Sequence, residues 1–298
     1  MRLAISNIAW DISEDIAVAK ILGKYNIDAI DIAPGKYFPD PVNAKDEDIE
    51  NVRHWWVDLG IEITGMQSLL FGTTGLNVFG ELESQNAMLD HLRAVSRIGA
   101  RLGATRLVFG SPKNRDRTGL SDAQALEHGV NFFRRLGDVA QGEGVIVCLE
   151  PNPICYGANF MTSSDETAQV VAATDHEAIR MQFDSGALTI NGESPAKVLE
   201  SCAKLIGHVH ASEPDLMPLG DGGADHRLMR EALAVYLPDH VVSVEMVATK
   251  NEQHLTSIER ALARAVEESW PMLRPVCWSR WLCCRPESFL LCQSLLKL

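Results

Sequence analysis

The sequence contains no long apolar run. No stretch approaches the roughly 18 apolar residues that a membrane-spanning helix needs, so we expect no membrane association. Met1–Trp10 is apolar, but Asp11 and Glu14 end this run too early for the apolar region of a signal peptide. We therefore predict a cytoplasmic protein.

Basic residues are scarce beside acidic ones. The chain has 27 Lys and Arg against 40 Asp and Glu, a formal net charge of -13. An acidic surface repels the phosphate backbone of nucleic acids. The nearest approach to a basic block, Lys113, Arg115 and Arg117, is short and is interrupted by Asp116. We therefore expect no nucleic-acid partner.

Regularly spaced cysteines are also missing. Seven cysteines are present, an odd number, and four of them lie at or after residue 277. This pattern argues against a disulfide framework and predicts reduced thiols.

The chain lacks a glycine-rich phosphate loop after its first apolar run, Leu3–Ser6. Such a loop follows the first strand of many doubly wound open sheets. Here the run continues as Ser6-Asn7-Ile8-Ala9-Trp10-Asp11. Of the two α/β folds considered, a doubly wound open sheet is therefore a weaker prediction than a closed barrel.

What the chain does contain is an alternation of short apolar runs with longer amphipathic segments. The runs are short and continuously apolar, as strands buried on both faces are. They are Leu3–Ser6, Ala29–Ile32, Ile61–Met66, Arg106–Phe109, Val145–Leu149, Ile179–Phe183, Leu205–Val209 and Val241–Val244. Helical patterns cover Glu14–Leu22, Asn86–Leu102, Asp122–Gln141 and Asn251–Glu267. Eight strand–helix repeats predict a (β/α)₈ TIM barrel.

Local signals mark where several of these helices begin and end. Ser13, Ser121 and Ser163 are expected N-caps, and Gly60 and Gly103 are expected to stop helices just before strands.

One catalytic domain is expected over residues 1–268, because 298 residues suit a single barrel. The tail, residues 269–298, is atypical, since it holds three of the six tryptophans and shows no clean period. We favour an aberrant end, such as translation past a disrupted frame, over a docked terminal segment, and assign the tail no function.

Four consecutive predicted strands end in polar residues: Glu150, Asp184, His210 and Glu245. Catalytic groups in a barrel come from this end of the strands. A lone acid there is more often a helix cap or a salt-bridge partner, but four in register favour a metal site. Three converging carboxylates repel one another unless a divalent cation lies between them. Oxygen ligands with one imidazole suit Mn²⁺, our first choice, and also Mg²⁺, Co²⁺ or Zn²⁺.

Five further residues near predicted strand ends are candidates for substrate binding. Gln67 suits a hydrogen bond to a substrate hydroxyl, or else a loop cap. Trp10 suits stacking on the substrate or closing the pocket, or else core packing. His208 suits core packing or support of the site, and Glu213 suits orientation of a hydroxyl or of His210. His226 opens the next helix close to the site.

The loop after the fourth strand carries Lys113, Asn114 and Arg115. A cationic cluster at the mouth of the barrel suggests an anionic group on the substrate. The alternative is a solvated loop that balances nearby acids.

Four short motifs surround the proposed ligands: Leu149-Glu150-Pro151-Asn152, Phe183-Asp184-Ser185-Gly186, Gly207-His208-Val209-His210 and Val244-Glu245-Met246. They resemble the metal-ligand motifs of the xylose-isomerase-like TIM barrels. This group is the sugar phosphate isomerase/epimerase superfamily (AP endonuclease family 2), which includes endonuclease IV. The resemblance covers about residues 1–265. It implies Glu150, Asp184, His210 and Glu245 as ligands of one divalent metal, with the two glutamates as the acid/base pair.

The sequence departs from this resemblance in two places. Ala187 stands where several family members carry a histidine, and Met217 stands where the ketose 3-epimerases carry an arginine. Both differences weaken an assignment as a free-ketohexose epimerase.

The leading hypothesis is an isomerase or epimerase that acts on a sugar or sugar phosphate through an enediolate. The runner-up is a metal-dependent dehydratase of a cyclic polyol or dehydroshikimate-like acid on the same site. An endonuclease is disfavoured, because the mouth supplies too few histidines for a three-metal cluster. A barrel that binds a ligand without catalysis remains an alternative, and assembly into a homo-oligomer remains an alternative as well.

Overall fold

The computed structural model describes residues 1–267, which form a closed barrel of eight parallel strands. Each strand pairs with the next in sequence order, and β1 pairs with β8 to close the barrel. The strands are β1 Arg2–Ser6, β2 Ala29–Ile32, β3 Glu62–Met66, β4 Arg106–Phe109, β5 Ile146–Leu149, β6 Ile179–Asp184, β7 Ile206–Ser212 and β8 Val241–Glu245. All eight predicted strands are confirmed.

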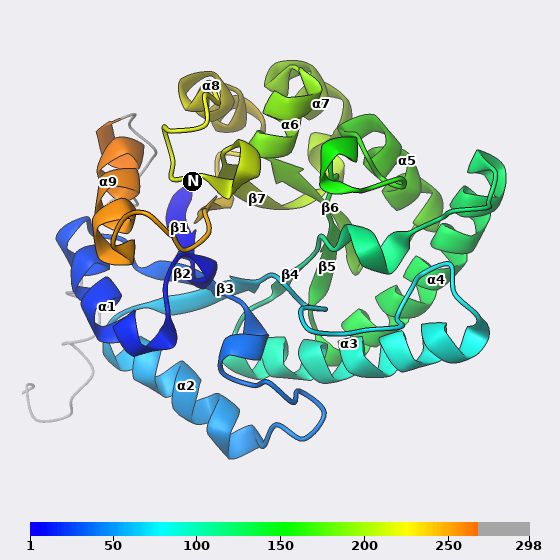
Figure 1. The fold of residues 1–298 in the computed structure, drawn as a ribbon, viewed down its shortest axis with the longest axis horizontal. Helices are drawn as coiled ribbons and strands as arrows, with labels where there is room; N and C mark the ends of the chain where they lie inside the picture. Colours follow the sequence, from blue (N-terminus) through cyan, green and yellow to red (C-terminus); the bar gives the residue numbers. More distant parts are fainter. Residues whose placement is uncertain (268–298) are drawn as a thin grey trace, which may run out of the picture.

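The helices form a ring around this barrel (Figure 1). They are α1 Asp15–Lys24, α2 Asp46–Asp58, α3 Leu82–Leu102, α4 Asp122–Glu143, α5 Ser164–Thr174, α6 Ser185–Asn191, α7 Pro195–Cys202, α8 His226–Tyr236 and α9 His254–Glu267. Because α9 lies beside α1, the ring of helices closes where the barrel closes (Figure 1).

Short 3₁₀ turns occupy most of the loops that follow the strands. They are Asn7–Ala9, Ile12–Glu14, Pro34–Lys36, Pro112–Arg115, Ile154–Tyr156 and Pro214–Leu216, whereas a further turn, Ala203–Leu205, lies between α7 and β7. Those that follow β1, β2, β4, β5 and β7 lie at the carboxyl end of the barrel, where they shape its mouth.

Most of the predicted helix boundaries are confirmed. Ser121 caps α4 in a reciprocal capping box with Gln124, and Ser163 caps α5. Gly103 ends α3 with φ +86°, a left-handed conformation that suits glycine. The expectation for Ser13 is wrong. Asp11 caps this turn instead, because its carboxylate accepts from the Ser13 backbone N–H at 2.9 Å.

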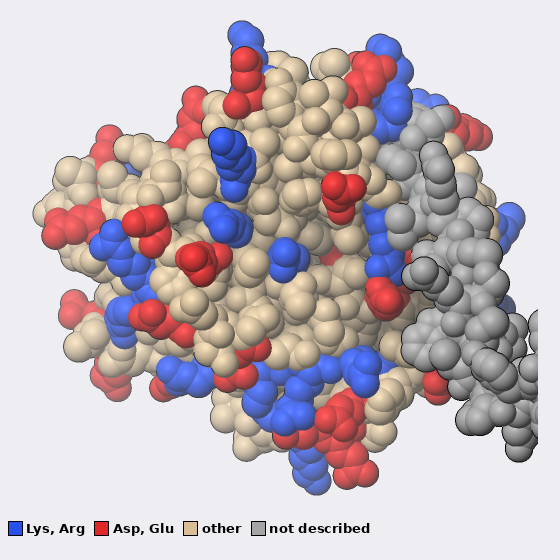
Figure 2. All heavy atoms as spheres, turned by 180° about the vertical axis from the view of Figure 1, so that it is seen from behind, with Lys and Arg blue, Asp and Glu red and all other residues tan. Residues whose placement is uncertain are grey.

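Within the described residues, no helix combines the length and the apolar composition that crossing a membrane requires. On the face seen in Figure 2, basic and acidic side chains are interspersed rather than gathered by sign. Cys148, Cys155 and Cys202 are free thiols, as predicted. The four later cysteines and the predicted tail, residues 269–298, lie outside the described residues.

Candidate metal centre

Four side chains meet at the carboxyl ends of β5 to β8. Glu150 directly follows β5, Asp184 ends β6, His210 lies in β7 and Glu245 ends β8. The strand register pairs Asp184 with His210, so neighbouring strands bring their polar residues to one level. Each of the four side chains offers one ligand atom, and these atoms all lie within 4.8 Å of one another.

The imidazole of His210 lies at the centre of this cluster. Its Nδ1 atom is 3.2 Å from Glu245 Oε2, 3.5 Å from Glu150 Oε1 and 3.9 Å from Asp184 Oδ2. Ligands that share an ion through bonds of about 2.1 Å lie roughly 3–4 Å apart. One imidazole with three carboxylates is also a suitable donor set for a hard or borderline divalent cation. The four residues therefore fit one metal ion.

The two glutamates are held in the same way. A carboxamide donates to the Glu oxygen that does not face His210: Gln67 Nε2 to Glu245 Oε1, and Asn152 Nδ2 to Glu150 Oε2 at 3.1 Å. Each glutamate thus keeps one oxygen directed at the cluster while the other is fixed.

Asp184 is held by two other donors. The backbone N–H of Ala187 donates to its Oδ1 atom at 2.7 Å, so the same carboxylate caps α6. The Ser212 hydroxyl donates to its Oδ2 atom at 2.8 Å. The aspartate is therefore oriented without an ion.

The cluster carries strong electrostatic coupling. Burial, together with the charges of Glu150 and Glu245, raises the pKa of Asp184 to about 7. Burial disfavours the charged imidazole, but Glu245 and Glu150 outweigh it and hold the pKa of His210 well above its usual range. In the metal-free protein, protons on these two groups relieve the repulsion that a cation would otherwise relieve.

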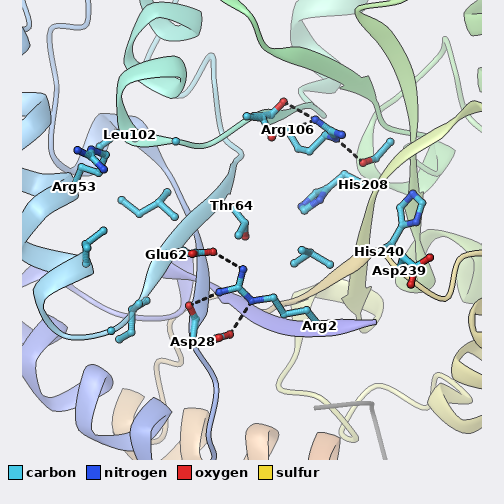
Figure 3. Close-up of a pocket in the computed structure, with 18 residues that line it drawn as sticks. Arg2, Asp28, Arg53, Glu62, Thr64, Leu102, Arg106, His208, Asp239 and His240 are labelled. Carbon is cyan, nitrogen blue, oxygen red and sulfur yellow. Dashed lines mark hydrogen bonds and ion pairs between the residues drawn. The ribbon is translucent and has the colours of Figure 1, made fainter. Parts of the chain in front are cut away.

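Asp31 and His208 lie buried on the inner side of His210. His208 Nε2 lies 2.6 Å from Asp31 Oδ2, and His210 Nε2 lies 4.0 Å from the same oxygen. His208 also faces a second cavity of about 800 Å³, at the amino end of the strands (Figure 3). There Arg2 forms ion pairs with Asp28 and Glu62 (Figure 3). We therefore assign the charged side chains at this end a structural role.

A cavity of about 790 Å³ opens above the four-residue cluster, and Glu150, Asp184 and Glu245 line its floor. Among the residues that the sequence proposed for substrate binding, Gln67 and Lys113 line this cavity. Lys113 lies exposed at its edge, where Nζ donates to the Thr73 backbone oxygen at 3.3 Å.

The other proposed substrate residues of β1 and β4 lie away from the cavity surface. Trp10 is buried and donates to Asp15 at 2.7 Å. Asn114 is buried and donates to the Leu76 backbone oxygen at 2.8 Å. Arg115 is fully buried, and its guanidinium donates to the backbone oxygen of Glu150 at 2.8 Å. The expected cationic cluster is therefore divided between one exposed lysine and a buried arginine that supports the backbone of a site residue.

Glu213 and His226 form a buried pair beside the site. The Glu213 carboxylate accepts from the backbone N–H groups of Gly220 and Ala224 at 2.6 and 2.9 Å, and lies 2.8 Å from His226 Nε2. The pair ties the loop after β7 to the start of α8. Both side chains lie outside the lining of the cavity.

Sequence reasoning missed three residues that contact the cluster or its neighbours: Asp31, Asn152 and Ser212. Asp31 carried the same signal as Glu150, a carboxylate in an otherwise apolar strand. Asn152 and Ser212 each lie two residues beyond a proposed ligand, a spacing that returns a side chain to the same side of an extended chain.

Comparisons with known proteins agree with the barrel fold. The family model described as "Xylose isomerase-like TIM barrel" matches residues 18–269. No curated protein matches the chain.

Three similar solved structures have the following measures. D-psicose 3-epimerase with D-tagatose from Clostridium cellulolyticum H10 is 17% identical, with 90% of this chain and 98% of that chain covered and a TM-score of 0.74. Apo 3-keto-D-glucoside 4-epimerase from E. coli is 18% identical, with 90% and 99% covered and a TM-score of 0.73. IOLI protein with a bound zinc atom is 16% identical, with 90% and 98% covered and a TM-score of 0.71. At these identities the likeness establishes the shared fold.

Proposed function

The chain belongs to the xylose isomerase-like TIM-barrel family, and from that membership we propose that it is a metal-dependent isomerase or epimerase of a sugar. The main support is the geometry of Glu150 and Glu245. Each directs one carboxylate oxygen at the four-residue metal cluster, and its other oxygen accepts a hydrogen bond from a carboxamide. The epimerases among the similar structures support this reading.

The proposed cofactor is one divalent cation held by Glu150, Asp184, His210 and Glu245. When bound, it would supply polarisation of a substrate carbonyl and its neighbouring hydroxyl, which acidifies the C–H between them. We propose Mn²⁺, because the donor set is rich in oxygen. The similar IOLI structure holds a zinc atom, which supports a bound cation in this chain, and Zn²⁺, Mg²⁺ and Co²⁺ are the alternatives to compare.

The two glutamates are the proposed acid and base. They arise from β5 and β8, which are separated in the barrel by β6 and β7, so they approach a substrate from different sides. One carboxylate removes a proton from carbon, and the other returns a proton from the opposite face. Return to the same carbon inverts it, whereas return to the neighbouring carbon moves the carbonyl group.

The carboxamides of Gln67 and Asn152 are the proposed positioning groups. Each occupies one carboxylate oxygen of its glutamate, which limits rotation of that carboxylate. A carboxylate held in this way meets a substrate proton without prior reorganisation.

The test is solvent-deuterium exchange into keto sugars by protein loaded with Mn²⁺, followed by NMR. We expect exchange at the carbon beside the carbonyl without loss of water, whereas loss of water would indicate a dehydratase. Glu150→Gln and Glu245→Gln should each lower the exchange rate about 10²–10⁴-fold. Glu62→Gln, at the opposite end of the barrel, is the matched control and should keep the rate. Unchanged exchange in both site variants would contradict the proposal.

A further inference from the structure

The cavity above the metal cluster has two chemically different halves. Its inner half presents the carboxylates of Glu150, Asp184 and Glu245 together with Gln67. Its outer half is lined largely by apolar side chains from the loops after β1, β3, β5, β7 and β8. These include Ile8, Leu70, Phe71, Tyr156, Leu216 and Val247.

Three of the outer side chains are unusually accessible for their size. Phe71 is 85% exposed, Val247 is 42% exposed and Tyr156 is 37% exposed. A single exposed apolar side chain is ordinary on a protein surface. A group of them around one cavity is typical of a binding surface. Here the group lies directly above a cluster of ionisable residues.

The outer half is also a built structure, because its loops are bonded to one another. The Asp215 backbone N–H donates to the Tyr156 hydroxyl at 2.6 Å, and the Val247 N–H donates to the Leu216 backbone oxygen at 3.0 Å. Ala248 N–H donates to the Ile8 backbone oxygen at 3.1 Å. The loops that carry Ile8, Tyr156, Leu216 and Val247 are therefore held relative to one another.

Leu216 is in a strained conformation. Its φ is +52° and that of Asp215 is +59°, the left-handed region that side chains other than glycine seldom adopt. Such strain persists where the surrounding structure holds it, and it gathers at functional sites. Here it accompanies an apolar leucine at the cavity wall.

The charged side chains that line the cavity limit the class of substrate further. Of the described residues that line the cavity, Lys36 and Lys113 carry a positive charge. The Lys36 ammonium is bonded to the backbone oxygens of Asn7 and Trp10. Lys113 lies at the exposed edge. One lysine is held by backbone oxygens and the other is exposed, so the cavity offers a sugar phosphate little positive charge against three carboxylates.

We propose that the substrate is an uncharged keto sugar that bears an apolar alkyl or aryl substituent, which binds against Phe71, Leu216 and Val247. This inference rests on the proposed function. A cavity of about 790 Å³ lies in the upper part of the roughly 300–1,000 Å³ range of sites for drug-sized ligands. A single free sugar ring would leave much of the apolar half in contact with water.

The experiment compares methyl and phenyl 3-keto-β-glucosides as exchange substrates of the full chain loaded with Mn²⁺. Fructose 6-phosphate serves as the charged comparison. We expect kcat/KM for the phenyl compound to exceed that for the methyl compound about tenfold or more. Calorimetric binding of unoxidised phenyl and methyl β-glucoside to the metal-free protein gives a second readout. The phenyl compound should bind more tightly there as well.

Variants of Phe71 test whether the apolar half of the cavity contributes to substrate preference. Phe71→Ala should lower the phenyl-to-methyl preference about threefold or more, and Phe71→Tyr should retain it. Val235→Ala is the matched control, because Val235 is 73% exposed on α8, outside the cavity lining. It should leave the preference unchanged.

Each contrary outcome points to a different failure. Equal kcat/KM values for the methyl and phenyl compounds, or a higher kcat/KM for fructose 6-phosphate, would overturn this inference. Either result would leave the proposed function standing. Loss of self-association in Phe71→Ala with the preference intact would show that a second copy of the chain covers the apolar wall instead. Absence of exchange with every compound would overturn the proposed function, and the calorimetry would then decide the apolar site alone.

Discussion

The carboxylate of Asp31 lies 2.6 Å from the ring of His208, and both side chains are buried inside the barrel. The same carboxylate oxygen is 4.0 Å from Nε2 of His210, whose Nδ1 faces the metal cluster. A metal-bound imidazole is commonly oriented by a carboxylate near its other nitrogen. Asp31 lies on that side of His210, beyond hydrogen-bond distance, and acts on the imidazole through its charge.

Replacement of Asp31 should therefore weaken metal binding. We expect Asp31→Asn to lower the affinity for Mn²⁺ about 10–100-fold, the usual cost of losing such a partner. Competition with a coloured chelator would measure it. Asp28→Asn is the control, because Asp28 belongs to an ion pair at the opposite end of the barrel. Equal affinity in the two variants would argue against this role for Asp31.

Gln67 should affect proton transfer more than metal binding, because it bonds the Glu245 oxygen that faces away from His210. Loss of a hydrogen bond to a charged group costs about 1.5–3 kcal/mol. We expect Gln67→Met to lower kcat for deuterium exchange about 10-fold or more, with metal content unchanged. Gln141→Met, at an exposed position on α4, should keep the parent rate. A variant that loses metal instead would mean that Gln67 supports the ligand set.

The metal-free protein should lose stability as pH rises. The pKa of Asp184 is raised from 3.8 to about 7 on folding, so the folded chain holds a proton that the unfolded chain releases. The stabilisation from this proton is full below about pH 4 and is lost as pH rises through about 7. The raised pKa of His210 acts in the same direction.

Calorimetric Tm values of chelator-treated protein from about pH 5 to about pH 8 would measure this loss, at about 2–4 °C for each kcal/mol. Added Mn²⁺ should reverse the slope, because the ion competes with those protons. Asp184→Asn should flatten the metal-free slope, whereas the exposed Asp138→Asn should keep it. A metal-free Tm that rises over this interval would be inconsistent with the charge arrangement.

Gly110 tests how closely the chain is packed around Glu150. An added Cβ at Gly110 would lie 1.9 Å from Glu150 Oε2, so Gly110→Ala must displace this carboxylate. We expect a loss of exchange activity of about tenfold or more, with stability lowered by about 1–3 kcal/mol. Gly35→Ala is the control in the same cavity, because no heavy atom lies within 4 Å of the added carbon. Urea unfolding and the exchange assay would separate the two effects.

The alternation of buried strands and amphipathic helices was readable from the chain, because backbone pairing and burial impose their own periods on a sequence. The ligand set was readable for a related reason. Acids and a histidine that end apolar strands are costly to bury, so Glu150, Asp184, His210 and Glu245 stood out against their surroundings. Ser13 was misplaced because several polar residues near a turn compete for one cap.

Only the closed barrel decided which residues share the cavity. Arg115 and Lys113 are two positions apart in the sequence, yet one is buried beneath Glu150 and the other is exposed at the rim. Asp31 and His208 are 177 positions apart and in contact. Sequence patterns report the local period and the cost of burial, whereas the partner of a buried polar group depends on which distant strand closes against it.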